Sequence, residues 1–130
     1  MFTKEERSGF KYWFAHWCAF QMTALNHKCW KSKYLFHDIE KPWLKLIWSY
    51  PKVQKWHREH NSHHLESLYT RTKIDFLAMI IDWECSRFTK ESSPRTAREE
   101  YLKIRNEVPF WTQGLLDRYL LPLLNKYNFK

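Results

Sequence analysis

The chain has 130 residues, enough for one domain whose hydrophobic core needs no disulfide to hold it together. Eight Trp, seven Tyr and nine Phe predict a bulky core, and only two Gly argue against a turn-rich all-β fold. The formal net charge of +8 fits either a solvated basic surface or attraction to an anionic partner.

An anionic partner would be a small phosphorylated molecule or a nucleic acid. The chain has no dense run of Lys and Arg and no zinc-finger or RNA-binding signature, so nucleic acid is the weaker candidate. Cys18, Cys29 and Cys85 form an odd set without a CxxC pair, which predicts reduced thiols. Charges at Lys4–Arg7 argue against a signal peptide, and the uncharged run Tyr12–His27 is too short for a membrane span. We therefore expect a cytoplasmic protein without a membrane segment.

The first predicted helix begins at a capping-box pattern formed by Thr3 and Glu6. From Phe10 to Leu25 this helix is apolar on almost every side, so we expect it to run through the middle of the domain. His16 lies inside the run, where it is either a satisfied core residue or a metal ligand. A second, shorter helix is predicted from Cys29 to Asp38.

Short amphipathic pieces and prolines follow. One predicted helix covers Trp43–Trp48, and another begins at Pro51. If the second helix continues unbroken, it presents three histidines on one face, namely His57, His60 and His64. Alternatively, Asn61–Ser62 caps a new helix that begins at His63. The residues leave both arrangements open.

Thr72–Thr89 is the best-defined predicted helix, because its apolar residues recur with a period of 3.6. The expected core stripe consists of Ile74, Leu77, Ala78, Ile81, Cys85 and Phe88. Asp82 falls inside this stripe, although Asp is rarely buried without a partner. Two explanations fit the position: a salt bridge to a core-facing Arg or Lys, or ligation of a metal ion.

After a polar linker, Ser93–Pro94 is the predicted N-cap and first residue of a charged helix that extends to Asn106. Its expected inner face consists of Ala97, Tyr101 and Ile104. A final helix is predicted from Trp111 to Tyr127 with a kink at Pro122, and its apolar residues close the core or form a dimer face. We expect one all-α domain over residues 1–130, with about six or seven helices.

Residues able to bind a metal recur along the chain, in the order His16, His37, Asp38, His57, His63, His64 and Asp82. Imidazole and carboxylate ligands together suit Mn, Fe, Zn, Ni or Co better than Ca. An ionised Asp38 after the apolar run Tyr34–Phe36 should be buried, which is costly unless it is paired or bound to a metal.

This order resembles the HD-domain superfamily of metal-dependent phosphohydrolases, and His37–Lys41 is similar to that family's HDxxK form. More narrowly, residues 10–88 resemble a family of small HD-like proteins of bacteria and phages. The resemblance leaves the C-terminal helices, residues 94–127, without a counterpart. The chain also lacks the Gly-Tyr-Pro motif of the cyclic-dinucleotide branch, which argues against that substrate.

The resemblance implies an HD-domain-like helical bundle with one or two divalent transition-metal ions. The first ion would be bound by His16, His37, Asp38 and Asp82, and the second by His57 with His63 or His64. Asp38 would bridge the two ions, because a carboxylate can do so and an imidazole normally cannot. Lys41 would face the substrate phosphate, with Arg58 and Asn61 as further substrate contacts and His60 as a surface residue.

These features predict an enzyme that hydrolyses a nucleotide or another small phosphate ester, with Asp38 and Lys41 as its catalytic residues. Two other classes use similar residues: an HD-fold di-iron oxygenase, and a metal-containing binding or regulatory protein without turnover. The sequence does not separate these classes, and a second copy of the chain remains a possible partner.

Overall fold

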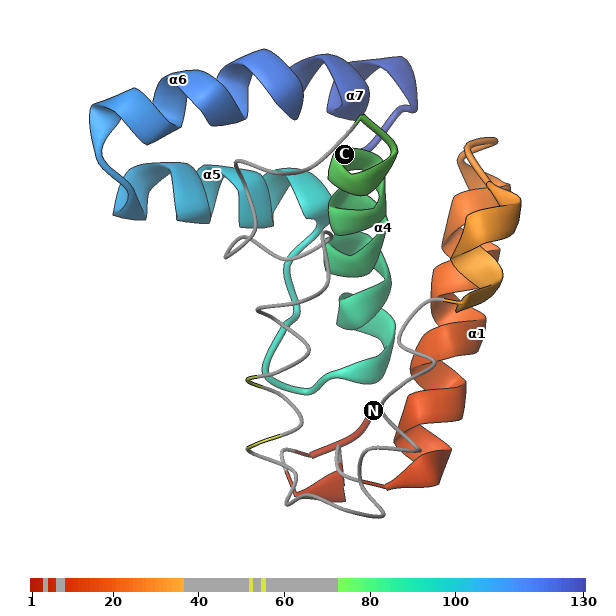
Figure 1. Ribbon diagram of the computed structural model, residues 1–130. Helices are drawn as coiled ribbons and strands as arrows, with labels where there is room; N and C mark the ends of the chain where they lie inside the picture. Colours follow the sequence, from red (N-terminus) through yellow and green to blue (C-terminus); the bar gives the residue numbers. More distant parts are fainter. Residues whose placement is uncertain (4, 7–8, 37–51, 53–54, 56–72) are drawn as a thin grey trace.

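The computed structural model describes residues 1–3, 5–6, 9–36, 52, 55 and 73–130 (Figure 1). These residues form helices and no named strand, apart from one isolated bridge between Phe2 and Lys90. The elements are α1 (Phe10–Asn26), the 3-10 helix η2 (Ser32–Phe36), α4 (Lys73–Thr89), α5 (Ala97–Glu107), α6 (Phe110–Tyr119) and α7 (Leu121–Lys126). The all-α prediction is therefore confirmed.

The expected count of six or seven helices stays a prediction. The helix predicted over Trp43–Trp48 lies outside the described residues. Of the helix predicted from Pro51, the structure describes only Lys52 and Lys55, both with helical backbone.

Helix α4 is the central element of the described fold. It contacts α1 on one side and α5 on another, and the figure shows it standing between α1 and the C-terminal helices (Figure 1). Every residue of Asp75–Asp82 is buried, so the helix is enclosed on most of its circumference. The predicted α4 stripe is confirmed at Leu77, Ala78, Ile81 and Cys85 but is wrong at Phe88, which is 57% exposed.

Helix α1 lies at one side of the described helices and buries only one face, so the expectation that it runs through the middle is wrong for this part of the chain (Figure 1). One face is buried and packs on α4; its members include Tyr12, His16, Phe20 and Ala24. The opposite face exposes large apolar side chains, namely Phe10, Phe14, Met22 and Leu25. None of the helices in the described ranges is both long and apolar enough to cross a bilayer.

The capping box at the N-terminus forms, but it does not begin α1. The backbone N–H of Thr3 donates to Glu6 Oε1 at 3.1 Å, and the N–H of Glu6 donates to Thr3 Oγ1 at 3.3 Å. The neighbouring Phe2 pairs through its backbone with Thr89 and Glu91 at the end of α4, at 2.9 and 3.1 Å. This pairing holds the first residues extended, and α1 starts only at Phe10.

The second predicted helix, over Cys29–Asp38, is only partly formed among the described residues. Lys28 has a positive φ of 57° and ends the α1 turn, and only Ser32–Phe36 is helical, as a 3-10 helix. Two contacts fix this short helix: Tyr34 packs edge-on against Phe20, and Lys33 forms an ion pair of 2.9 Å with Asp75.

The C-terminal helices form a hairpin that closes the core. Helices α5 and α6 lie side by side, and α7 continues from the end of α6 (Figure 1). The predicted kink near Pro122 is confirmed as a break at Leu120, because proline has no N–H and its ring clashes with the preceding turn. Four leucines of α6, α7 and the turn between them are buried, which supports the core-closing alternative: Leu116, Leu120, Leu123 and Leu124. Phe110 and Trp111, at the start of α6, are exposed.

A polar triad joins α5 to α6. Arg105 donates two hydrogen bonds to the carboxylate of Asp117, at 2.8 and 2.9 Å, and the hydroxyl of Tyr101 donates to the same carboxylate. The hydrogen bonds from Arg105 lower the pKa of Asp117 the most, and the bond from Tyr101 lowers it further. The pKa of Tyr101 is raised to about 12, mainly by burial and in addition by the hydrogen bond to Asp117.

The start of α5 differs from the prediction and gives a test. Thr96 is the N-cap, and it exchanges hydrogen bonds with Glu99 in a complete capping box; Ser93 lies three residues earlier, outside the helix. Thr96→Ala should lower the free energy of unfolding by about 1 kcal/mol, because a helix N–H loses its acceptor. Urea denaturation is the measurement. The control Ser93→Ala should change it by less than about 0.5 kcal/mol, and the reverse order of effects would contradict the assigned cap.

Candidate metal centre

His16 and Asp82 meet at the interface between α1 and α4. His16 Nε2 lies 2.9 Å from Asp82 Oδ1, and the two residues are only 3% and 8% exposed. Each lies on the face that its helix turns toward the other helix, so packing of the two apolar faces brings the side chains together. The structure thus brings together two of the predicted ligands. The partner of Asp82 found here is an imidazole, whereas the alternative explanation expected an Arg or a Lys.

The neighbours of His16 fix the orientation of its ring. Tyr12, one turn earlier on α1, stacks on the imidazole with centroids 5.7 Å apart and planes inclined by 22°. Phe2 in turn packs edge-on against Tyr12 at 5.5 Å. Aromatic rings on the His16 side therefore limit both water access and rotation of the imidazole, which favours a defined position of its two nitrogens.

Cys85 is the third donor in this cluster, and sequence reasoning missed it. Its Sγ lies 3.9 Å from His16 Nδ1, and the residue is fully buried. The three residues bring one donor atom each to within 4.8 Å of one another: a nitrogen of His16, a carboxylate oxygen of Asp82 and the sulfur of Cys85. The sequence signal for Cys85 is its spacing from Asp82, because two residues three apart on a helix share a face. The sequence pattern places Cys85 in the apolar stripe of α4 and gives no further sign that it is a donor.

The donor types fit a divalent transition metal. The 2.9 Å between Nε2 and Oδ1 is the length of a direct hydrogen bond. Two ligands at about 2.1 Å from one tetrahedral ion lie roughly 3.4 Å apart, so a bound ion would replace this hydrogen bond after a shift of about 0.5 Å. Carboxylate, imidazole and thiol groups are the usual protein ligands of Zn and Fe.

The two nitrogens of His16 face different partners. Nε2 lies at Asp82, whereas the nitrogen 3.9 Å from Cys85 Sγ is Nδ1. An ion bound between Nε2 and Asp82 would leave Nδ1–H free to donate to the sulfur, and such outer contacts orient metal-binding histidines. The thiol itself donates to the Asp82 backbone carbonyl at 3.4 Å. With an ion at Nε2, Cys85 would position His16 and would not bind the ion itself.

The segment that leads toward His37 is attached to α1 beside His16. Trp17 Nε1 donates to the carbonyl of Leu35 at 3.0 Å. Gln21, one turn further along α1, donates to the carbonyl of Tyr34 and accepts from Trp30 Nε1 at 2.7 Å. Three polar contacts therefore hold the end of η2 and the residues before it against the helix that carries His16.

Most of the other predicted site residues are not placed. His37, Asp38, Lys41, His57, Arg58, Asn61, His63 and His64 lie outside the described residues. The same is true of His60, which was expected at the surface. His27, the remaining histidine, has a structural role: its Nδ1 lies 2.7 Å from the Tyr127 carbonyl, and its ring stacks on Phe129.

Comparisons with known proteins give no match to this chain, whether with protein-family models, curated proteins or solved structures. The resemblance to the HD-domain superfamily therefore stays a prediction from residue types and their order. What the described structure adds is geometric: a buried imidazole and a buried carboxylate in contact, with a thiol beside them.

The geometry predicts how Cys85 behaves when the protein binds cobalt(II). We expect no thiolate-to-cobalt charge-transfer absorption, because the Cys85 sulfur faces Nδ1 and the ion would lie at Nε2. Cys85→Ser, which keeps an acceptor for Nδ1–H, should bind cobalt within about threefold of the wild type, a difference under 1 kcal/mol. Cys29→Ser alters another buried thiol and serves as the control. A charge-transfer band that disappears only in Cys85→Ser would show that the thiolate binds the ion directly.

Proposed function

We propose that this chain is a metal-dependent phosphohydrolase with an HD-like helical fold, acting on a nucleotide or another small phosphate ester. The observation that supports it best is the buried contact of 2.9 Å between His16 and Asp82, two residues 66 positions apart that the resemblance assigns to one ion. The excess of basic residues, with a net charge of +8, favours an anionic substrate. Three free cysteines are consistent with a reducing compartment, and we propose the cytoplasm.

In this proposal His37 and Asp38 complete the first metal site. The attachment of Leu35 to Trp17 supports it, because this contact ties the last described residues before His37 to the helix that carries His16. His57 with His63 or His64 would bind a second ion, and Asp38 would bridge the pair. The described residues do not include this second group, so the number of ions is part of the proposal.

The division of labour among the residues follows from their chemistry. When bound, the metal would polarise the phosphate ester and lower the pKa of a bound water toward neutrality. Asp82 would offset part of the metal charge, and the Tyr12 ring would keep bulk water away from His16. Lys41 and Arg58 would neutralise the substrate phosphate, and Asn61 would donate a hydrogen bond to it. The bundle of six or seven helices would hold these groups in one cleft.

A second candidate function is a metal-binding protein without turnover. Cys85 favours it, because a fully buried thiol among the donors is typical of closed structural zinc sites. Direct binding by the Cys85 thiolate would therefore support this candidate against the hydrolase.

The metal site is tested by comparing two buried carboxylates of the same helix. Divalent metal (Mn²⁺, Co²⁺ or Zn²⁺) should raise the melting temperature of the wild type, because binding to the native state alone stabilises it. Asp82→Asn should lose most of this shift. Asp75→Asn, which changes a carboxylate that pairs with Lys33, should keep it. Equal shifts in the two variants would exclude Asp82 as a ligand.

Turnover is tested with nucleotides and generic phosphoesters, in the presence of metal and then of a chelator. Chelator-sensitive release of phosphate or nucleoside is expected from the wild type. Asp38→Ala should reduce the rate about a thousandfold or more, equivalent to roughly 4 kcal/mol of barrier, since both ions would lose a ligand. Undiminished turnover in Asp38→Ala would contradict the mechanism, and bound metal without turnover on any substrate would favour the second candidate.

The histidine assignment gives a separate prediction. His57→Ala should remove about one ion per chain, measured by elemental analysis, because it is assigned to the second site alone. His60→Ala, three residues away and expected at the surface, is the matched control and should retain the wild-type metal content. Equal metal loss in both variants would mean that His60 also contributes to the metal site and that the assigned inward face of this helix is wrong.

A further inference from the structure

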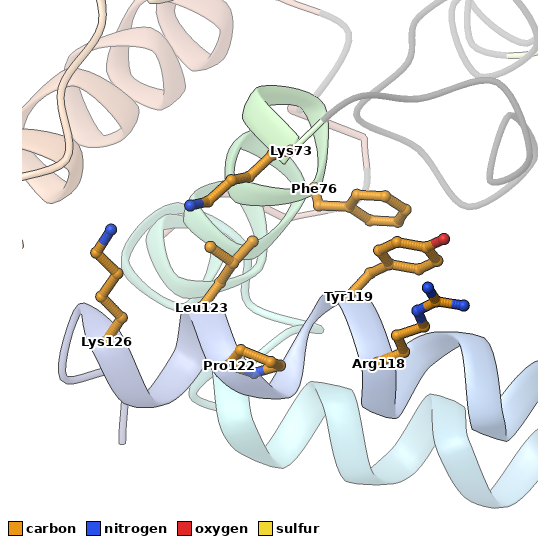
Figure 2. A pocket seen from close by; sticks show the side chains of 7 residues that line it. All are labelled: Lys73, Phe76, Arg118, Tyr119, Pro122, Leu123 and Lys126. Carbon is orange, nitrogen blue, oxygen red and sulfur yellow. The ribbon is translucent and has the colours of Figure 1, made fainter.

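A groove separate from the metal cluster lies between the start of α4 and the junction of α6 with α7 (Figure 2). Its volume is about 370 Å³, at the small end of the range for ligand-binding pockets. The break at Leu120 that Pro122 causes contributes to this shape, because it changes the course of the C-terminal helices at the groove.

The floor of the groove is apolar and partly aromatic. Phe76 of α4 stacks on Tyr119 of α6, with ring centroids 4.9 Å apart and planes inclined by only 4°. Pro122 and Leu123 complete the floor from α7. Tyr119 is still 40% exposed, although Phe76 and the Arg118 guanidinium both lie against its ring. A ligand would therefore contact the part of the ring that these two side chains leave uncovered.

Three cationic side chains border this floor. Figure 2 shows the Lys73 and Lys126 ammonium groups near one end, and Arg118 beside Tyr119 at the other. The Arg118 guanidinium lies 5.5 Å from the Tyr119 ring centroid. No acidic residue lines the groove in the described part of the chain, and none of the three cations forms an ion pair there. The groove is therefore an apolar surface between positive charges that no described carboxylate pairs with.

The groove and the metal cluster lie on different faces of α4. Six residues separate Phe76 from Asp82, which corresponds to about 9 Å along the helix and about 120° around it. Cys85 is nine residues from Phe76, and its side chain points about 180° away. A ligand in the groove would therefore not contact the His16–Asp82 pair.

We infer that this groove binds a small aromatic molecule that carries a phosphate group. The aromatic body would lie against Tyr119 and the apolar floor, and the phosphate would lie between Lys73 and Lys126. A phosphate monoester carries about −1.5 to −2 at neutral pH and so balances the charge of two ammonium groups. A carboxylate ligand carries a single negative charge and would balance them only in part. The volume limits the body to one or two rings.

Isothermal titration calorimetry with 1-naphthylmethylphosphonate tests this inference. Its phosphorus–carbon bond is not a phosphoester, so the probe survives even if the protein is a phosphohydrolase. Saturable binding at one site per chain is expected. Binding of 1-naphthaleneacetate should be at least tenfold weaker, and binding of neutral 1-naphthylmethanol weaker still. Comparable affinity for all three probes, or no saturable binding of the phosphonate, would overturn the inference.

Variants locate the site. Lys126→Gln should weaken phosphonate binding about tenfold or more, whereas Lys11→Gln, an exposed lysine on α1, should change it less than twofold. Tyr119→Leu should weaken binding, and Tyr119→Phe, which keeps the ring, should restore it. Equal weakening by Lys126→Gln and Lys11→Gln would indicate general attraction to a basic surface and contradict the groove.

A chelator separates this inference from the proposed metal-dependent activity. Phosphonate binding in the groove should be unchanged when a chelator is present, because none of its lining residues belongs to the metal cluster. Binding that disappears with the chelator would place the phosphonate at the metal centre and overturn the groove site. Failure of the hydrolase proposal would leave the binding result as it is.

Discussion

Three buried carboxylates on the central helix organise the described fold. An ionised carboxylate cannot be buried without a compensating donor or cation, and α4 buries three. Asp75 is paired with Lys33 of η2, Asp82 with His16 of α1, and Glu84 with the Ala97 N–H that begins α5, at 2.7 Å. Each carboxylate therefore fixes a different part of the chain against α4. The Asp82 pair alone consists of two groups that are also good metal ligands, which is why the proposed metal centre lies there.

The fold was predictable where local chemistry decides the structure. The 3.6 periodicity defined α4 to within one residue, and Pro122 marked the break between α6 and α7. Prediction failed where distant contacts decide. The composition of α1 does not reveal that its second face is exposed. The capping box at Thr3 likewise does not reveal that Phe2 pairs with the end of α4. Thr96 and Glu99 have the spacing of a capping box, and in the structure this pair, not Ser93, caps α5.

The candidate site was predictable in part, for a physical reason. A carboxylate on an apolar helix face requires a partner, so Asp82 could be identified from its own surroundings. His16 could be identified in the same way, but only the packing of α1 on α4 shows that the two meet. Cys85 was missed because a buried cysteine has the pattern of any small apolar residue. The groove beside Tyr119 was also missed, since it combines residues of α4, α6 and α7 that no sequence spacing connects.

The attachment of α1 to late parts of the chain has a consequence for biosynthesis. Its buried face packs on α4, which ends about 60 residues after α1 does, and His27 at its end stacks on Phe129. At about 5–20 residues per second, a ribosome needs roughly 3–12 s to complete α4 after α1. During this interval the face around Phe20 and Ala24 lacks the helix that covers it in the finished protein. Nascent α1 is therefore a candidate segment for chaperone binding, and slow translation through α4 would lengthen its exposure.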